Sequence, residues 1–332
     1  MAEYSGVLVC GEVVEGKVSS LTAELLGCSR KLADSLHEPA MLVLVGSEVS
    51  NLASQGAALG ADKVFVADDA LLKEYQTDAY LSVLAKLVAD TSPRYILFGQ
   101  SAIGRDLAPR LAFRIGAVLT TDCIELGVDP QTKGLLQTKP VYGGNARAIF
   151  TSPSFPQLAT VRQKAMSPLQ PDASRKAEVV TLAVKVDPAV MKSKLLQTVK
   201  EEAAGIKLED APIVVCGGRG IGSADGFKQL EELARMLKGA VGATRPACDS
   251  GWVPAHVQVG LTGKIVTPDL YIGVAISGAS QHMAGCSGSK VIVAINKDPE
   301  ANLFKEARYG VVGDWKQALP AFVNKVKELL AG

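Results

Sequence analysis

Short apolar runs alternate with helical patterns along the first 120 residues of the chain. The runs lie at residues 7–10, 41–45, 63–66 and 95–99. Between them, a helical pattern occupies residues 20–35, and Leu107, Leu111 and Ile115 recur at the spacing of a helix with one buried face. Strands that alternate with helices in this way predict βαβ units around a mainly parallel sheet.

The pattern changes after residue 120. Residues 121–186 predict irregular β structure, because turn-forming pairs such as Asp129-Pro130 and Ser152-Pro153 interrupt them. Residues 187–210 are rich in charge and contain no sustained apolar run, so we place a domain boundary there. We expect this segment to act as a hinge. The predicted parts are an N-terminal α/β domain over 1–190, a linker over 191–210 and a second domain over 211–332.

The second half returns to the alternation of strands and helices. Apolar runs lie at residues 212–216, 270–276, 291–296 and 309–312. Phe227, Leu230, Leu233 and Leu237 mark one apolar helix face. The predicted fold class is therefore α/β, with two α/β domains that each contain a mainly parallel sheet.

Composition and charge exclude several classes of function. The chain has 332 residues, enough for two domains, with 35 basic and 34 acidic residues and a formal net charge of +1. Without a basic run, a nucleic-acid partner is not expected. The apolar runs are far shorter than the ~20 residues that span a bilayer, so direct membrane insertion is not expected either.

The six cysteines are scattered and form no CxxC pair, which argues against a disulfide framework or a zinc site. The N-terminus resembles neither a signal peptide nor a transit peptide. We therefore expect a cytoplasmic protein, or a mitochondrial matrix protein if the chain is a processed eukaryotic form.

Two glycine-rich segments and one histidine stand at the ends of predicted strands. "GGRGIGS" (residues 217–223) lacks the Rossmann GxGxxG spacing, although its glycines allow positive φ and close approach to a ligand around Arg219. "VGLTGK" (residues 259–264) is not a phosphate-binding P-loop. Gln281 and His282 follow the run 270–276, and ligands of open α/β sheets bind at the carboxyl ends of strands. A structural role for His282 is the alternative.

These segments carry a family resemblance. "LYIGVAISGASQHMAGCSGSKVIVAINKDPEA" (residues 270–301) resembles the characteristic segment of the α subunit of electron transfer flavoproteins, the family that includes FixB. "GGRG", "GATRPACDSGWVP" and "QVGLTGK" precede it in the family's order, and "GRDLAPRLA" in the first half also fits. The resemblance covers essentially the whole chain.

The resemblance implies one FAD, bound by a Rossmann-like (DHS-like) C-terminal domain. It also implies a heterodimer with a β subunit, in which a second FAD or an AMP is possible. The N-terminal domain would pack with the β subunit, and a nucleotide site in it is not favoured. The implied cofactor-binding residues are Arg219, Thr244, Arg245, Val259, Gly260, Leu261, Thr262, Ser277, Gly278, Ala279, Ser280, Gln281, His282, Asn296, Asp314 and Trp315.

The resemblance also implies a role for each group of residues. Arg245 and His282 would face the negative charge of a reduced flavin and tune its potential, and Thr262 would offer its hydroxyl to N5. Arg219 would lie near the flavin or its phosphates, and Asn296, Asp314 and Trp315 would border the adenosine end. No residue is expected to act on a substrate carbon, and no metal is expected.

Two departures from the family affect these expectations. Leu261 stands where the family often has glutamine, so only its backbone N–H could donate to the cofactor. Ser280 replaces a usual aliphatic residue and would add a polar contact. The detail of redox tuning is therefore not predictable from the family.

Three functions are compatible with the sequence. The leading one is an electron carrier that accepts electrons from flavin-containing dehydrogenases, such as acyl-CoA dehydrogenases of fatty acid β-oxidation, and passes them to a quinone reductase. The second is the α subunit of an electron-bifurcating flavoprotein that oxidises NADH. The third is a non-redox module that binds NAD or AMP.

Overall fold

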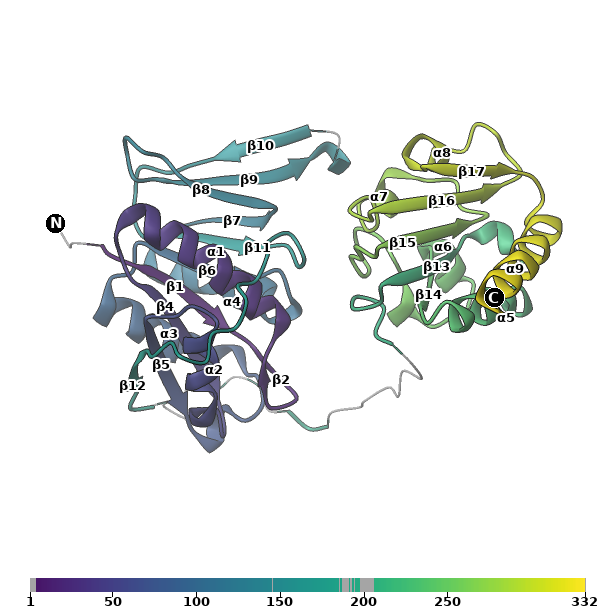
Figure 1. The fold of residues 1–332 in the computed structure, drawn as a ribbon. Coiled ribbons are helices and arrows are strands. Elements are labelled where there is room, and N and C mark those ends of the chain that lie inside the picture. The colour runs from purple at the N-terminus through teal and green to yellow at the C-terminus, as the bar shows by residue number, and fades with distance from the viewer. Residues whose placement is uncertain are drawn as a thin grey trace. The chain divides into compact units, whose positions relative to one another are not determined.

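The computed structural model describes residues 4–144, 146–184, 186, 191, 193, 195–197 and 206–331. The chain divides into two compact units, Met1–Val199 and Lys200–Gly332, which are described separately (Figure 1). Most of the predicted hinge over 187–210 lies outside the described residues. The domain limits at 190 and 211 therefore remain predictions, as does the hinge.

A seven-stranded parallel sheet forms the centre of the N-terminal unit, in the order β12-β5-β4-β1-β6-β11-β7. Its strands are β1 (Val7–Gly11), β4 (Ala40–Gly46), β5 (Lys63–Asp68), β6 (Tyr95–Gly99), β7 (Val118–Cys123), β11 (Gln157–Val161) and β12 (Glu178–Thr181). The parallel arrangement confirms the predicted fold class for this unit.

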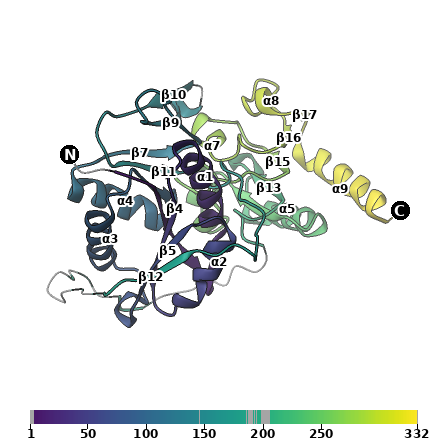
Figure 2. The ribbon, with the colours of Figure 1, turned by 60° about the vertical axis from the view of Figure 1, so that its left-hand side comes forward.

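Helices cover both faces of this sheet. The helices are α1 (Ser20–Leu36), α2 (Ala53–Ala58), α3 (Thr77–Thr91) and α4 (Ala102–Ile115). Leu25 of α1 and Ala53 of α2 belong to one buried cluster, whereas Leu84 of α3 and Leu111 of α4 belong to the cluster on the opposite face (Figure 2). Of the three residues whose spacing predicted a buried helix face, Leu107 and Leu111 are buried and Ile115 is partly buried against the same cluster.

The prediction of irregular β structure over residues 121–186 was wrong for two strands. β11 is fully buried within the parallel sheet, and β12 pairs with β5 at its edge. Gln157 and Thr160 obscured β11 because they are polar, yet both are 0% exposed. Their side chains are satisfied by hydrogen bonds, for example between Gln157 Oε1 and the backbone N–H of Leu135 (2.5 Å).

Smaller β elements complete the N-terminal unit. A three-stranded antiparallel sheet contains β8 (Glu125–Val128), β9 (Leu135–Val141) and β10 (Ala146–Phe150). A short hairpin joins β2 (Val13–Val14) and β3 (Lys17–Val18). Among the described residues of both units, no helix has the length and apolar character needed to cross a bilayer.

The C-terminal unit is built on a five-stranded parallel sheet in the order β14-β13-β15-β16-β17. Its strands are β13 (Ile213–Gly217), β14 (Ala240–Ala243), β15 (Leu270–Val274), β16 (Val291–Asn296) and β17 (Tyr309–Val312). Its helices are α5 (Ala224–Met236), α6 (Arg245–Asp249), α7 (Ser280–Met283), α8 (Leu303–Glu306) and α9 (Trp315–Ala331). The predicted fold class holds here as well.

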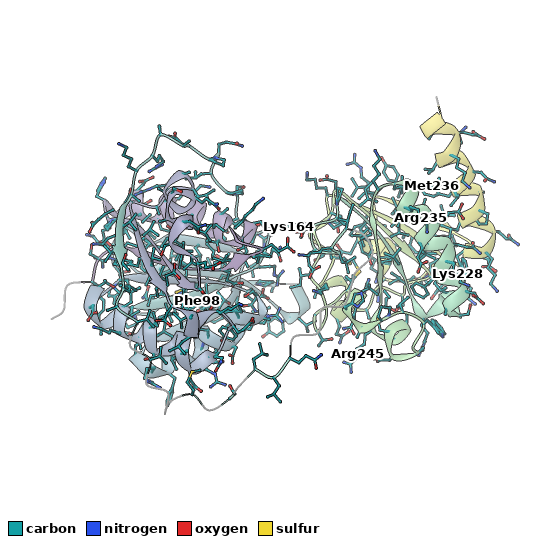
Figure 3. The ribbon with its side chains drawn as sticks, turned by 90° about the horizontal axis from the view of Figure 1, so that it is seen from below. Phe98, Lys164, Lys228, Arg235, Met236 and Arg245 are labelled. Atoms are coloured by element: carbon teal, nitrogen blue, oxygen red, sulfur yellow. The ribbon has the colours of Figure 1, made fainter. Side chains whose placement is uncertain are left out.

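Helix α5 packs on this sheet through the face that the sequence predicted. Phe227 and Leu230 are buried together with Leu319 of α9, while Lys228 and Arg235 lie on the outer face of α5 (Figure 3). The opposite face of the sheet is covered mainly by the long connections around residues 259–286, which contribute Val259, Met283 and Cys286 to a second buried cluster.

The order of strands creates a switch point between β13 and β15. The chain leaves β13 toward β14 on one side and returns to β15 on the other side. The connections that follow the two strands therefore run in opposite directions and leave a crevice at their carboxyl ends, where open α/β sheets bind ligands.

The loops after β13 and β15 approach each other closely at Gly218. A Cβ at this position would lie 2.1 Å from the carbonyl oxygen of Ala275. Gly217 is needed for a similar reason, because its Cβ would meet the ring of Phe227. We expected the glycines at 217, 218, 220 and 222 to supply positive φ, but only Gly222 has it (φ +89°). At Gly217, Gly218 and Gly220, close packing is the main reason why the chain has glycine.

Gly218→Ala tests this close approach. The φ of −93° at Gly218 suits any residue, so only the contact with Ala275 opposes the methyl group. We expect the free energy of unfolding of the C-terminal unit to fall by about 1–3 kcal/mol. Urea denaturation followed by tryptophan fluorescence reports on this unit alone, since both tryptophans, Trp252 and Trp315, belong to it.

Gly313→Ala is the matched control. A Cβ at Gly313 would have no neighbour within 4 Å, so its unfolding free energy should change by no more than about 0.5 kcal/mol. Equal unfolding free energies for the two variants would contradict the close approach at Gly218.

Candidate functional site

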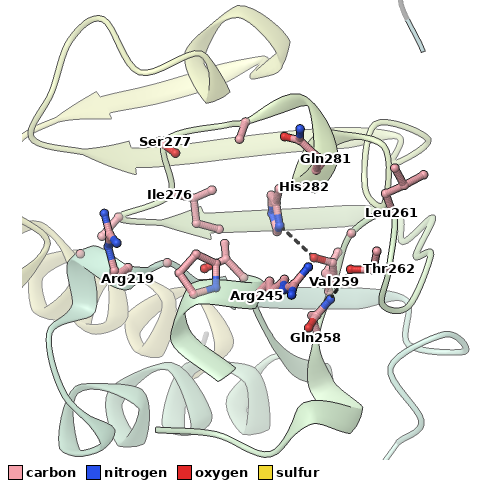
Figure 4. Close-up of a pocket in the computed structure, with 17 residues that line it drawn as sticks. Arg219, Arg245, Gln258, Val259, Leu261, Thr262, Ile276, Ser277, Gln281 and His282 are labelled. Carbon is pink, nitrogen blue, oxygen red and sulfur yellow. Dashed lines mark hydrogen bonds between the residues drawn. The ribbon is translucent and has the colours of Figure 1, made fainter. Parts of the chain in front are cut away.

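A cavity of about 690 Å³ lies at the carboxyl ends of β13, β14 and β15 (Figure 4). Its size falls within the range of about 300–1,000 Å³ that is typical of cofactor sites. The residues that line it are Gly218, Arg219, Gly220, Thr244, Arg245, Pro246, Gln258, Val259, Gly260, Leu261, Thr262, Ala275, Ile276, Ser277, Ala279, Gln281 and His282. The sheet topology therefore places the cavity at the switch point.

The charged groups of the cavity are cationic. Arg219 follows β13 and Arg245 begins α6, and no Asp or Glu stands among the described residues that line the cavity. The Arg245 side chain is 66% exposed, and its Nε lies 3.4 Å from the carboxylate of Asp249 on the same helix. Because the cavity presents two guanidinium groups and no carboxylate, it favours an anionic ligand.

Hydroxyl and amide groups add neutral hydrogen-bonding capacity. Gln258 Nε2 donates to Thr262 Oγ1 (3.0 Å), so the hydroxyl proton of Thr262 remains available for another acceptor. Thr244 is 8% exposed, and its hydroxyl has no hydrogen-bond partner among the described residues. Such a buried unsatisfied group is costly and marks a place where a bound molecule can supply the partner.

Apolar side chains form much of the remaining wall. Val259, Ala275 and Ile276 come from the segments after β14 and β15, and Pro246 comes from α6. Leu261 is 54% exposed at the cavity. Apolar walls with a few placed polar groups are the usual composition of a site for a planar cofactor ring.

His282 contributes to the cavity from α7 but uses both ring nitrogens within the protein. Nδ1 lies 3.0 Å from the carbonyl oxygen of Val259, and Nε2 lies 2.8 Å from the hydroxyl of Tyr271. The residue is 7% exposed, and burial lowers its pKa from 6.5 to about 4. We expected His282 to face the negative charge of a reduced flavin as a hydrogen-bond donor or a cation. The structure instead has a neutral imidazole whose two nitrogens are already bonded.

Several of the sequence-predicted residues lie outside the cavity lining. Gly278 and Ser280 belong to the same connection as Ser277 and Gln281 but do not line the cavity. Gly278 has a φ of +78°, and a Cβ there would meet the backbone of Leu303. Ser280 Oγ is 3.4 Å from Gln281 Oε1. Both residues shape the connection, and their contact with a cofactor remains a prediction.

The three residues predicted for the adenosine end also lie outside the lining. Asn296 Nδ2 donates to the carbonyl of Ile276 (2.8 Å), and Trp315 Nε1 donates to the carbonyl of Gly220 (3.2 Å). Asp314 Oδ1 accepts from the backbone N–H of Lys316 (3.0 Å) at the start of α9. Asn296 and Trp315 thus brace two segments that line the cavity. Their contact with adenosine, and that of Asp314, remain predictions.

The structure adds residues that the sequence did not assign to the site. Gly218, Gly220, Pro246, Gln258, Ala275 and Ile276 line the cavity without having been predicted. Ala275 and Ile276 were read as the end of a strand. Each lies within two positions of a predicted site residue, which was the available signal. The backbone N–H of Leu261, predicted as a cofactor donor, instead donates to the carbonyl of Gln281 (2.7 Å).

The N-terminal unit contains a smaller cavity of about 150 Å³, lined by residues such as Glu12, Lys73 and Tyr80. This volume is below the usual range for cofactor sites. No group of His, Cys, Asp and Glu suited to a metal ion was found within the described parts of either unit. The larger cavity is therefore the candidate site.

The lowered pKa of His282 predicts a pH dependence of stability. The unfolded chain takes up a proton at His282 as the pH falls through about 6.5, whereas the folded chain does so only near pH 4. The C-terminal unit should therefore lose about 3 kcal/mol of stability, relative to His282→Gln, between pH 6.5 and pH 4. Above about pH 7.5, where His282 is neutral in both states, this difference should be constant. Urea denaturation of both proteins across this pH range, followed by tryptophan fluorescence, measures it.

Carboxylates titrate in both proteins, so their effect on the free energy of unfolding cancels when His282→Gln is compared with the wild type. Stability curves that remain parallel down to pH 4 would contradict the neutral, buried state of His282.

Comparison with known proteins identifies the family. The electron transfer flavoprotein domain matches residues 7–187, and the electron transfer flavoprotein FAD-binding domain matches residues 207–287. The chain is 42% identical to the electron transfer flavoprotein subunit alpha of Thermoanaerobacterium thermosaccharolyticum, over 99% of this chain and 100% of that protein. It is also 42% identical to the electron transfer flavoprotein subunit alpha of Megasphaera elsdenii, over 99% of this chain and 98% of that protein.

A more distant relative has a longer chain than this protein. It is the lactate dehydrogenase (NAD(+),ferredoxin) subunit LctC of Acetobacterium woodii, which is 35% identical over 98% of this chain and 77% of its own length. The family predicted from the motifs is confirmed over both units, and with it the binding of FAD. The chain belongs to the family of electron transfer flavoprotein alpha subunits.

Proposed function

We propose that the cavity at the carboxyl ends of β13, β14 and β15 holds the FAD through which this electron transfer flavoprotein subunit carries electrons. The observation that carries the proposal is the lining itself, with two arginines, no described carboxylate and apolar walls at the switch point of a parallel sheet. FAD combines a pyrophosphate dianion with a flat, largely apolar ring system, and the lining offers a counterpart for each part.

The residues of the cavity fit this cofactor. Arg219 and Arg245 would hold anionic groups at the carboxyl ends of β13 and β14. Val259 and Ile276 would contact the ring system, and the unpartnered hydroxyl of Thr244 would gain a hydrogen-bond partner. The predicted contacts of Gly260, Ser277, Ala279 and Gln281 are also compatible with their places in the lining.

The chemistry of the site divides between the cofactor and the chain. FAD, when bound, supplies the redox chemistry that no side chain of the protein can supply. The apolar wall around Val259 and Ile276 limits access of water, and Arg245 provides a fixed positive charge. Gln258 orients the hydroxyl of Thr262 so that its proton can be donated into the cavity. No residue of the lining is proposed to act on a substrate carbon.

The family works as a heterodimer of α and β subunits, so a β subunit is the partner of this chain. As donors we propose flavin-containing dehydrogenases, acyl-CoA dehydrogenases above all, and as acceptor a membrane quinone reductase. We place the heterodimer in the cytoplasm. Support for this location comes from bacterial relatives and from the six cysteines, which are all free in the structure.

Electron bifurcation is the second candidate function. It is favoured by the match to a subunit whose name pairs NAD(+) with ferredoxin, since such an enzyme couples two different redox partners. In that case a second FAD in the β subunit would accept electrons from NADH, and the flavin of this chain would relay them singly. Both candidates use the same cavity in this subunit.

Removing either arginine should weaken FAD binding. A charge-assisted hydrogen bond contributes about 1.5–3 kcal/mol, so Arg219→Gln and Arg245→Gln should each raise the dissociation constant of FAD roughly 10- to 150-fold. Arg235→Gln is the matched control, because it removes the same charge from the outer face of α5, away from the cavity lining (Figure 3). Binding is measured by fluorescence titration of the deflavinated heterodimer. Equal affinities in all three variants would contradict the location of the site.

The number of flavins distinguishes the two candidate functions. For the simple carrier we expect one FAD in the heterodimer purified with its β subunit, with no bleaching of the flavin when NADH alone is added. Flavin release and absorbance spectroscopy measure both. Two FADs, of which NADH reduces one, would establish the bifurcating alternative. A colourless heterodimer that binds no added FAD would contradict both and support a non-redox module.

A further inference from the structure

Tyr271 lies beneath the candidate flavin site without lining it. It occupies the second position of β15, is 0% exposed, and places its hydroxyl 2.8 Å from Nε2 of His282. The thiols of Cys216 and Cys286 lie near enough to the same hydroxyl to raise its pKa. A phenol hydroxyl buried among three polar partners is an expensive arrangement unless its hydrogen bonds are satisfied in a definite direction.

The direction of each hydrogen bond follows from the partners. The carbonyl of Val259 can only accept, so Nδ1 of His282, 3.0 Å away, must donate to it. A neutral imidazole carries one ring proton, which leaves Nε2 as an acceptor. The hydroxyl of Tyr271 must therefore donate to Nε2, since sulfur is a much weaker acceptor than an imidazole nitrogen.

Burial keeps this arrangement of protons in place. It raises the pKa of Tyr271 well above its ordinary value and the pKa of Cys286 to about 12, so the phenol and the thiol keep their protons. The thiol of Cys286 faces the backbone carbonyl of His282 at 3.7 Å. The hydroxyl proton of Tyr271 is thus left for the imidazole.

The network ends on a segment that lines the cavity. Val259 is held on both sides, because its N–H donates to the carbonyl of Ala243 (2.8 Å) and its carbonyl accepts from His282. Two residues later, the N–H of Leu261 donates to the carbonyl of Gln281 (2.7 Å). Two hydrogen bonds therefore tie residues 259–261 to α7, and one of them depends on which nitrogen of His282 carries the proton.

We propose that Tyr271 is a positioning residue of the flavin site, which keeps the ring proton of His282 on Nδ1 and thereby fixes the Val259 carbonyl and residues 259–263 against α7. The part of this inference that concerns flavin rests on the proposed function. Tyr271 does not line the cavity and acts on it through His282, which bonds both to Tyr271 of β15 and to Val259 in the segment after β14.

The first test is the tautomer of His282 in the full chain labelled with ¹⁵N-histidine. At pH 7 we expect a protonated Nδ1 and an unprotonated Nε2 whose ¹⁵N shift shows a hydrogen bond to it. The chain has three histidines, and the signals that are missing from the spectrum of His282→Gln belong to His282. A proton on Nε2, or on both nitrogens, would overturn the proposal whether or not FAD is present.

The second test is Tyr271→Phe in the heterodimer with the β subunit. Without the hydroxyl, part of the His282 population should carry its ring proton on Nε2, which the ¹⁵N shifts report. The dissociation constant of FAD should rise about tenfold as residues 259–263 lose their fixed position. The separation between the two one-electron potentials should also change, which a purely structural role of Tyr271 would not require.

Tyr95→Phe is the matched control. Tyr95 is also 0% exposed, and its hydroxyl donates to the carbonyl of Lys133 (2.7 Å) in the N-terminal unit. Tyr95→Phe should lower the free energy of unfolding of that unit. It should leave the ¹⁵N chemical shifts of His282 and both flavin potentials unchanged. Wild-type affinity and potentials in Tyr271→Phe would overturn the positioning role. Failure of the wild-type heterodimer to bind FAD would instead reject the proposed function, while the tautomer measurement would still decide the proton assignment.

Discussion

The pairing of β13 with β15 is the constraint on which the candidate site depends. The two strands are neighbours in the sheet although β14 lies between them in sequence, so their connections diverge at the carboxyl ends. The loops then approach as closely as Gly218 and Ala275 allow. A cavity with walls from three strand ends follows from this topology, and the residues after each strand are its lining.

The lining of the cavity contains two kinds of nitrogen-bearing side chain, charged guanidinium groups and a neutral imidazole. The guanidinium groups of Arg219 and Arg245 supply positive charge at the cavity, while His282 is kept neutral beneath its surface by desolvation. An electron carrier has to hold its cofactor through changes in the charge of that cofactor. Permanent cations and a neutral, internally bonded imidazole meet this demand without uptake of protons by His282 near neutral pH.

The sequence predicted most of the fold and much of the site, and its errors have physical causes. The periodicity of the sequence predicted β1, α1, β6 and α5 because most of their buried positions are apolar. It missed β11, where Gln157 and Thr160 are buried polar residues satisfied by side-chain hydrogen bonds. Family motifs indicated the segments around Arg219, Arg245 and Gln281, but neither motifs nor spacing can show that the nitrogens of His282 bond to Val259 and Tyr271.

The crystal structure of the heterodimer with FAD is the measurement that tests the central claim most directly. The account predicts electron density for the flavin within the cavity, with ring contacts to Val259 and Ile276 and with Arg219 and Arg245 within hydrogen-bonding distance of the cofactor. Flavin density at any other place on this subunit, with the cavity filled only by solvent, would contradict the account.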